Sequence, residues 1–253
     1  MHDAIVHHSG ARIRWVELPG ADPARVYVHG LGATSAPYYA EVAAHPLLPR
    51  HRSLLIDLLG FGISDRPQDF PYTLEAHADA LADALRKAGV AGAAMIAHSM
   101  GGAVATVLAA RHAELVANLI LVDANLDPQA PGPVQPGSSG IASYTEESFV
   151  SDGWKEVRDR VGPHWWSTMR LADPRGLHRT AVSLAKGTTP TMRELLQALP
   201  IPRAYLHPEG GTPASADGLR ASGVQVLGIP ESGHNIMLDN PEAFARTLTT
   251  LLP

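Results

Sequence analysis

The most distinctive residue pattern is the segment AHSMGG at residues 97–102. A short apolar run precedes it and an alanine-rich stretch follows, so Ser99 lies where a predicted strand meets a predicted helix. The small residues Ala97 and Gly101 permit a tight turn that lifts the serine hydroxyl clear of the sheet. The amino end of the helix offers N–H groups and a positive dipole end to a developing oxyanion. This pattern indicates a nucleophilic serine.

A second segment, HGLG at residues 29–32, follows another short apolar strand. Its glycines let the backbone approach a ligand closely. The amide of Leu31 is then able to point into the same space as the amide of Met100. Two such donors form an oxyanion hole, and loss of one donor typically costs about 3 kcal/mol of transition-state stabilisation.

The third candidate is His234 in SGH, residues 232–234, between the last predicted strand and the last predicted helix. A histidine on a loop at the carboxyl edge of the sheet can reach a serine on a neighbouring loop and act as its base. The segment DLLGFGISD at residues 57–65 has a structural interpretation. Its glycines shape the turn after a strand, and Asp65 anchors the loop.

The elements that position these residues alternate along the chain. Strands are predicted at residues 12–18, 25–29, 53–57, 93–97, 119–122, 203–206 and 224–227, and helices at residues 73–89, 101–111 and from Asn240 to the carboxyl terminus. Continuous apolar strands that alternate with helices predict an α/β fold, with a parallel sheet covered on both faces.

The alternation breaks between about residues 128 and 200. The segment opens with PQAPGPVQPGSSG, carries Trp165 and Trp166, and has short helical stretches near residues 146–161 and 192–199. It is too long for an ordinary connecting loop. We therefore expect two units, a core formed by residues 1–127 and 200–253 and an inserted cap formed by residues 128–199.

Taken together, HGLG, DLLGFGISD, AHSMGG, SGH and NPEAF resemble the α/β-hydrolase family in order and spacing, over nearly the whole chain. The resemblance implies an eight-stranded, mostly parallel sheet, with a helical cap inserted after the sixth strand. It also implies that Ser99 is the nucleophile, His234 the general base, and Leu31 and Met100 the oxyanion donors. The serine excludes the haloalkane dehalogenase and soluble epoxide hydrolase branches, which need a carboxylate nucleophile at that position.

The third triad member departs from the common family pattern. Gly211 stands where an acid is expected after the seventh strand, and Glu209 lies two residues earlier. A minority of the family carries the acid after the sixth strand, where Asp123 ends an apolar strand. We favour Asp123, because a carboxylate beside the histidine holds its tautomer and stabilises the imidazolium. Glu209, Asp127 and the absence of an acid are the alternatives.

Composition limits the partners. The chain has 253 residues, 45% of them hydrophobic and 18% charged, with a net charge of −5 and no cysteine. The lack of cysteine excludes disulfides, thiolate metal sites and a cysteine nucleophile. The net charge and the hydrophobic content favour neither nucleic acid nor a membrane as partner. The amino terminus has no signal-like pattern, so we expect a cytoplasmic protein, monomeric or homodimeric. The adjacent His7 and His8 are expected to point to opposite faces of a strand, and no metal or cofactor is predicted.

The cap carries few charges around its tryptophans, which favours a small, largely apolar substrate. Side chains predicted to contact this substrate are Trp165, Trp166, Met169, Ile236 and Met237. The leading hypothesis is a cofactor-free serine hydrolase that cleaves a carboxylic ester or a lactone through an acyl-enzyme on Ser99. A thioesterase is a close alternative. A carbon–carbon bond hydrolase is less favoured, because such family members usually carry asparagine where this chain has His98. A catalytically weak ligand-binding receptor is the alternative of a different class.

Overall fold

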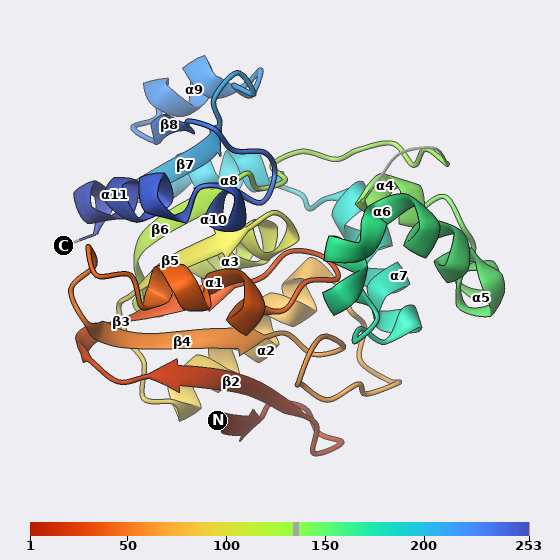
Figure 1. Cartoon of the computed structure of the whole chain (residues 1–253). Helices are drawn as coiled ribbons and strands as arrows, with labels where there is room; N and C mark the ends of the chain where they lie inside the picture. The colour runs from red at the N-terminus through yellow and green to blue at the C-terminus, as the bar shows by residue number, and fades with distance from the viewer. Residues whose placement is uncertain (134–136, 253) are drawn as a thin grey trace.

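Eight strands form a single sheet in the computed structural model, which describes residues 1–133 and 137–252 (Figure 1). The strands are β1 (His2–Ile5), β2 (Arg12–Leu18), β3 (Ala21–Val28), β4 (His51–Asp57), β5 (Ala93–His98), β6 (Val116–Val122), β7 (Arg203–Pro208) and β8 (Gln225–Ile229). Their order is β1-β2-β4-β3-β5-β6-β7-β8, and β2 pairs antiparallel with both of its neighbours while β3 to β8 pair in parallel. The predicted fold class is confirmed.

Helices cover both faces of this sheet. The flanking helices are α1 (Ser35–Ala43), α2 (Leu74–Lys87), α3 (Met100–Arg111), the 3₁₀ turn η1 (Ala113–Leu115), α9 (Ala216–Ala221), α10 (Ile236–Asp239) and α11 (Pro241–Leu251). Val26 of β3 packs in the hydrophobic cluster that contains α2 and α3, whereas the next residue, Tyr27, packs in the cluster that contains α1 and α11. This alternation explains why the parallel strands are apolar throughout.

Local signals in the sequence account for the ends of several elements. The hydroxyl of Thr73 accepts a hydrogen bond from the Ala76 N–H at 3.1 Å, and so caps α2 at the start of the helix predicted from residue 73. The carboxylate of Asp65 accepts from the Arg12 N–H at 2.9 Å, and so anchors the loop after β4 to the neighbouring strand β2. Helices α1, α9 and α10, and the helices Ser138–Ile141 and Pro174–Lys186, have no counterpart in the sequence prediction.

The cap lies between β6 and β7. It contains α4 (Ser138–Ile141), α5 (Glu146–Ser148), the π-helical turn η2 (Phe149–Gly153), α6 (Trp154–Met169), α7 (Pro174–Lys186) and α8 (Met192–Ala198). Figure 1 shows α4 to α7 grouped on the side of the sheet toward which the β4 arrow points. Helix α8 instead contacts α3 of the core. The division into a core (1–127 and 200–253) and a cap (128–199) stays a prediction.

Polar contacts join the cap to the core. His77 Nε2 of α2 lies 3.1 Å from Thr180 Oγ1 of α7, and the Leu74 N–H donates to Ser183 Oγ at 3.1 Å. The buried Tyr72 packs against Gly176 of α7, where a Cβ atom would lie 2.8 Å from its ring. The cap is therefore held directly by the amino end of α2 and the residues just before it.

The expectation for His7 and His8 was wrong. Strand β1 ends at Ile5 and β2 begins at Arg12, so both histidines lie in the turn between the two strands. A turn does not alternate its side chains as a strand does. The two imidazole rings consequently lie side by side, with their centroids 4.0 Å apart.

Within the described ranges, no helix is long and apolar enough to cross a membrane.

Candidate active site

Ser99 sits in a strained turn between β5 and α3, with φ 50° and ψ −122°. A non-glycine residue with positive φ is uncommon and is held by its surroundings. Close packing around the turn provides that constraint. A Cβ atom on Gly101 would lie 2.3 Å from the His29 carbonyl oxygen, and one on Gly102 would lie 2.4 Å from the Ala124 Cβ. The two glycines therefore let the turn lie directly against the neighbouring strand ends.

His234 and Asp123 form a hydrogen-bonded pair. His234, on the loop between β8 and α10, has its Nδ1 atom 2.7 Å from Asp123 Oδ2. Asp123 follows β6 directly, and its own N–H donates to the Leu206 carbonyl at 2.8 Å. Of the alternative acids, Glu209 is exposed and Asp127 forms an ion pair with Arg193. Among the candidate acids, Asp123 is the one that the structure places against His234.

The Ser99 hydroxyl donates to Asn125 Oδ1 at 3.3 Å. No hydrogen bond joins Ser99 to His234 within the part of the chain that the structure describes, although both side chains line one cavity. Serine–base hydrogen bonds are often long or absent before substrate binds. Asn125 was missed by the sequence analysis, and its place two residues after Asp123, in the loop that leaves β6, was the available signal.

The loop that carries Leu31 lies against the serine. A Cβ atom on Gly30 would lie 3.1 Å from the Ser99 Cβ. The Leu31 N–H donates to no partner among residues 1–133 and 137–252, and its carbonyl accepts from Trp165 Nε1 of the cap at 2.9 Å. Met100 is the first residue of α3, and the first N–H groups of a helix have no intrahelical partner. Two backbone donors thus flank Ser99.

His98 connects the serine turn to the histidine loop. Its Nε2–H donates to the His234 carbonyl oxygen at 2.9 Å, and the two rings are 4.5 Å apart. Complete burial, and then the neighbouring His234, hold the pKa of His98 well below 6.5, so its ring stays neutral. The bond to the carbonyl fixes where the His234 backbone sits relative to Ser99.

The cavity above Ser99 has a volume of about 490 Å³ and lies between the core and the cap. Tyr38 of α1 and His164 of α6 both line it, and their rings pack together with centroids 5.9 Å apart. It is lined by Gly30, Leu31, Ala33, Tyr38, His98, Ser99, Asn125, Gln129, Gly137, Ser138, Val161, His164, Trp165, Leu184, His234 and Asn235. None of these described lining residues is Lys, Arg, Asp or Glu.

Of the five side chains predicted to contact substrate, Trp165 lines this cavity. Trp166 stacks on Trp154 at 5.8 Å, because the next position on a helix points about 100° away. Met169 is buried against the HGLG loop, where a Cβ on Gly32 would lie 3.0 Å from its Cε atom. Ile236 and Met237 are completely buried in the hydrophobic cluster with α1 and α11. Packing of the core and the cap therefore accounts for these four residues.

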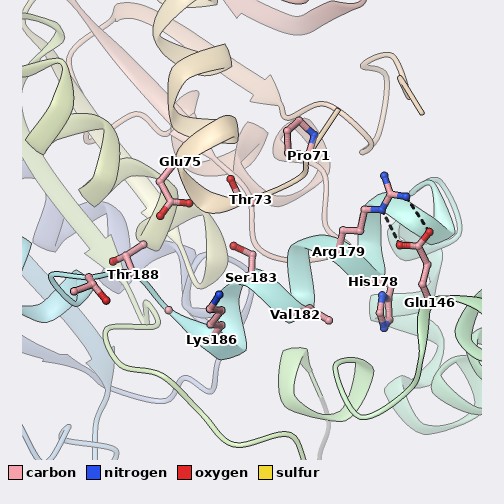
Figure 2. Close-up of a pocket in the computed structure, with 12 residues that line it drawn as sticks. Pro71, Thr73, Glu75, Glu146, His178, Arg179, Val182, Ser183, Lys186 and Thr188 are labelled. Carbon is pink, nitrogen blue, oxygen red and sulfur yellow. Dashed lines mark hydrogen bonds and ion pairs between the residues drawn. The ribbon is translucent and has the colours of Figure 1, made fainter. Parts of the chain in front are cut away.

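A second hollow, of about 540 Å³, lies between the amino end of α2 and α7 (Figure 2). It shares none of its lining residues with the cavity above Ser99. Its serine and histidine are already engaged, since Ser183 Oγ accepts from the Leu74 N–H and His178 Nε2 contacts the Tyr144 carbonyl. Its described lining residues therefore offer no equivalent arrangement for acyl transfer.

Curated relatives match different extents of the chain. A stretch of 119 residues, 47% of this chain, is 37% identical to a probable lysophospholipase BODYGUARD 4 of Arabidopsis thaliana. That match spans only 28% of the relative's length. A 2-hydroxy-6-oxo-6-(2'-aminophenyl)hexa-2,4-dienoic acid hydrolase of Metapseudomonas resinovorans is 26% identical, over 99% of this chain and 90% of its own.

Solved structures share the fold. An esterase from Exiguobacterium antarcticum superposes with a TM-score of 0.76 at 22% identity, covering 97% of both chains. An enol-lactonase from Burkholderia xenovorans LB400 does so with a TM-score of 0.75 at 20% identity, covering 99% of both chains. The family model for the alpha/beta hydrolase fold matches residues 26–225. The chain therefore belongs to the alpha/beta hydrolase fold family.

Proposed function

We propose that this protein is a serine hydrolase that cleaves uncharged carboxylic esters or lactones, without a cofactor, through an acyl-enzyme on Ser99. One observation carries the proposal. Ser99, on its strained turn, shares one cavity with His234, whose Nδ1 atom is held 2.7 Å from Asp123. Together these three side chains supply a nucleophile, a base and an orienting carboxylate.

The reaction then proceeds in two halves. The Ser99 hydroxyl turns from Asn125 toward Nε2 of His234, gives up its proton to that atom and attacks the substrate carbonyl carbon. The amides of Leu31 and Met100 hold the resulting oxyanion. The protonated His234 passes the proton to the departing alkoxide, which leaves an acyl group on Ser99. Water, deprotonated by His234, attacks this ester, and collapse of the second tetrahedral intermediate releases the acid and restores the serine.

Asp123 acts through His234 rather than on the substrate. Its carboxylate accepts the Nδ1–H, which leaves the Nε2 lone pair free to take the serine proton. The same carboxylate stabilises the imidazolium that forms in both halves of the reaction. His98 acts on the backbone, where its bond to the His234 carbonyl keeps the imidazole over the serine turn.

The lining of the cavity favours a neutral substrate. A carboxylate removed from water needs a cation or several hydrogen-bond donors for compensation. No lysine or arginine is found among the described lining residues. Leu31, Val161 and Leu184 provide apolar walls instead. The matched dienoic acid hydrolase acts on an acid by its name. The absence of lysine and arginine from the described lining, together with His98 beside the serine, favours ester or lactone cleavage over that carbon–carbon chemistry.

A fluorophosphonate probe tests the nucleophile. We expect one equivalent to attach to Ser99 and none to attach to the Ser99→Ala variant. Ser183→Ala is the matched control, because Ser183 lines the other hollow and should leave labelling unchanged. A protein that stays unlabelled and hydrolyses no ester, lactone or thioester would contradict the proposal and favour a ligand-binding role.

A pair of matched esters tests the substrate class. 4-Nitrophenyl butyrate and the 4-nitrophenyl monoester of succinic acid share a leaving group and differ by a carboxylate. We expect kcat/KM to favour the neutral ester by at least about tenfold, since the described lining of the cavity holds no lysine or arginine to compensate the carboxylate. A preference for the charged ester would refute the neutral class and leave the serine mechanism in place. A phenyl thioester and a set of lactones then rank the bond types.

A further inference from the structure

Three potential metal ligands meet on the surface, at the edge of the sheet formed by β1 and β2. His7 and His8 lie in the turn between those strands, and Asp69 lies in the loop between β4 and α2. One ligand atom from each residue lies within 4.8 Å of the other two. His8 Nε2 is 3.1 Å from Asp69 Oδ2, and His7 Nδ1 is 3.9 Å from Asp69 Oδ1. None of the three belongs to the site proposed around Ser99.

We propose that His7, His8 and Asp69 form a surface site for a divalent transition-metal ion of the Zn²⁺ type. Zinc binds imidazole nitrogen and carboxylate oxygen at about 2.0–2.2 Å, which puts neighbouring tetrahedral ligands about 3.3 Å apart. The 3.1 Å separation already meets that spacing, and the 3.9 Å separation needs only a small closing movement. Water completes the coordination, because His8 and Asp69 are both exposed.

Two of the three ligands are held in place without an ion. The His7 side chain is only 12% exposed, and its ring packs edge-on against the buried Phe70 at 5.8 Å. Phe70 follows Asp69 directly, so one buried side chain positions both the imidazole and the start of the carboxylate side chain. The Ser9 N–H donates to His7 Nδ1 at 3.4 Å, so Nδ1 is the unprotonated ring nitrogen, and a metal ion would replace Ser9 as the partner of its lone pair. A metal ion requires that form of the ring.

The ligand set selects the class of ion. Two imidazoles and one carboxylate suit zinc, nickel and copper, whereas Ca²⁺ and Mg²⁺ prefer sites built from oxygen. A bound ion would join the turn after β1 to the loop that contains Phe70 and Tyr72. Tyr72 packs against Gly176 of the cap, so the ion would stabilise the support of the cap rather than take part in the chemistry at Ser99.

Calorimetry with ZnCl₂ on the untagged, EDTA-treated and desalted protein tests the proposal. We expect one saturable site per chain, a rise in the unfolding temperature when Zn²⁺ is added, and no comparable heat with MgCl₂. His8→Ala and Asp69→Asn should each weaken binding by at least about tenfold, because the first removes an imidazole ligand and the second removes the negative charge of the carboxylate. Both residues are exposed, so both variants should fold, as circular dichroism in EDTA will show.

His45→Ala is the matched control. His45 Nε2 lies 3.0 Å from Glu242, and this histidine–carboxylate pair has no third potential ligand among residues 1–133 and 137–252. Zinc affinity and the zinc-dependent rise in unfolding temperature should be unchanged in this variant. No saturable binding, several equivalent weak sites, or equal affinity in His8→Ala and the unmodified protein would each overturn the proposal.

Discussion

Replacing Asp123 by asparagine removes the negative charge beside His234 and keeps the shape of the side chain. In the unmodified protein, Asp123 Oδ2 accepts from Nδ1 at 2.7 Å. An asparagine amide in that place can donate to Nδ1 instead, which puts the ring proton on Nε2. His234 can then no longer accept the Ser99 proton. We expect the variant to fold normally and to turn over very slowly.

The size of the effect depends on how far the pair is shielded from water. In a fully shielded triad, this substitution lowers kcat by about 10⁴, or roughly 5.4 kcal/mol of activation free energy. Here the side chain of His234 is 54% exposed and that of Asp123 is 27% exposed. Water can therefore partly replace the carboxylate, and we expect a loss of about 10²–10⁴ in kcat, or roughly 3–5 kcal/mol.

Steady-state hydrolysis of 4-nitrophenyl butyrate gives the comparison, with the unfolding temperature as a check on the fold. Glu209→Gln is the first control, because the exposed Glu209 is the alternative acid. Asp127→Asn is the second control, since Asp127 follows in the same loop and pairs with Arg193. Both controls should keep kcat within a few-fold. A folded Asp123→Asn protein within tenfold of full activity, or a collapse of activity in Glu209→Gln, would refute the reasoning.

Ser99→Ala and His234→Ala should each abolish turnover, and the double variant should be little worse than either, whereas multiplicative losses would show independent action. EDTA should leave kcat unchanged, and activity restored only by zinc would contradict the mechanism. Trp165→Ala should change the ranking of ester substrates, because Trp165 lines the cavity. Trp166→Ala should mainly lower the unfolding temperature, because Trp166 stacks on Trp154. Similar effects of both variants on the substrate ranking would contradict these two roles. Burial lowers the pKa of His77 to about 3, below its value in the unfolded chain. The free energy of unfolding should therefore fall as pH drops below about 6.5, by up to about 1.4 kcal/mol per pH unit. This fall should be less steep in His77→Phe, which has no titratable group at this position. An equal slope in both proteins would contradict this.

The strand–turn–helix around Ser99 could be predicted because its residue pattern is visible in a short stretch of sequence. The structure explains the two glycines after Met100, since a Cβ there would lie 2.3 Å from the His29 carbonyl oxygen or 2.4 Å from the Ala124 Cβ. The alternation of apolar strands with helices is likewise visible in short windows of sequence. The order of the motifs along the chain then led to His234 and Asp123, which the structure places 2.7 Å apart.

The composition of the cavity depends on contacts between distant segments. His164 of α6 lines the cavity beside Tyr38 of α1, more than 100 residues away in sequence, and no local pattern encodes that contact. Ile236 and Met237 follow the histidine in sequence, yet their short helix α10 turns both into the core. The sequence prediction also failed at His7 and His8, which lie in a turn. Adjacent side chains point to opposite faces in a strand but not in a turn.

Trapping the acyl-enzyme tests the central claim most directly. The protein is mixed with 4-nitrophenyl butyrate, quenched with acid during the burst of nitrophenol release, and analysed by intact mass spectrometry and peptide mapping. We predict a mass increase equal to one butyryl group, located on Ser99 and absent from Ser99→Ala. Steady turnover with no covalent adduct, or an adduct and turnover that persist in Ser99→Ala, would contradict the assignment of Ser99 as the nucleophile.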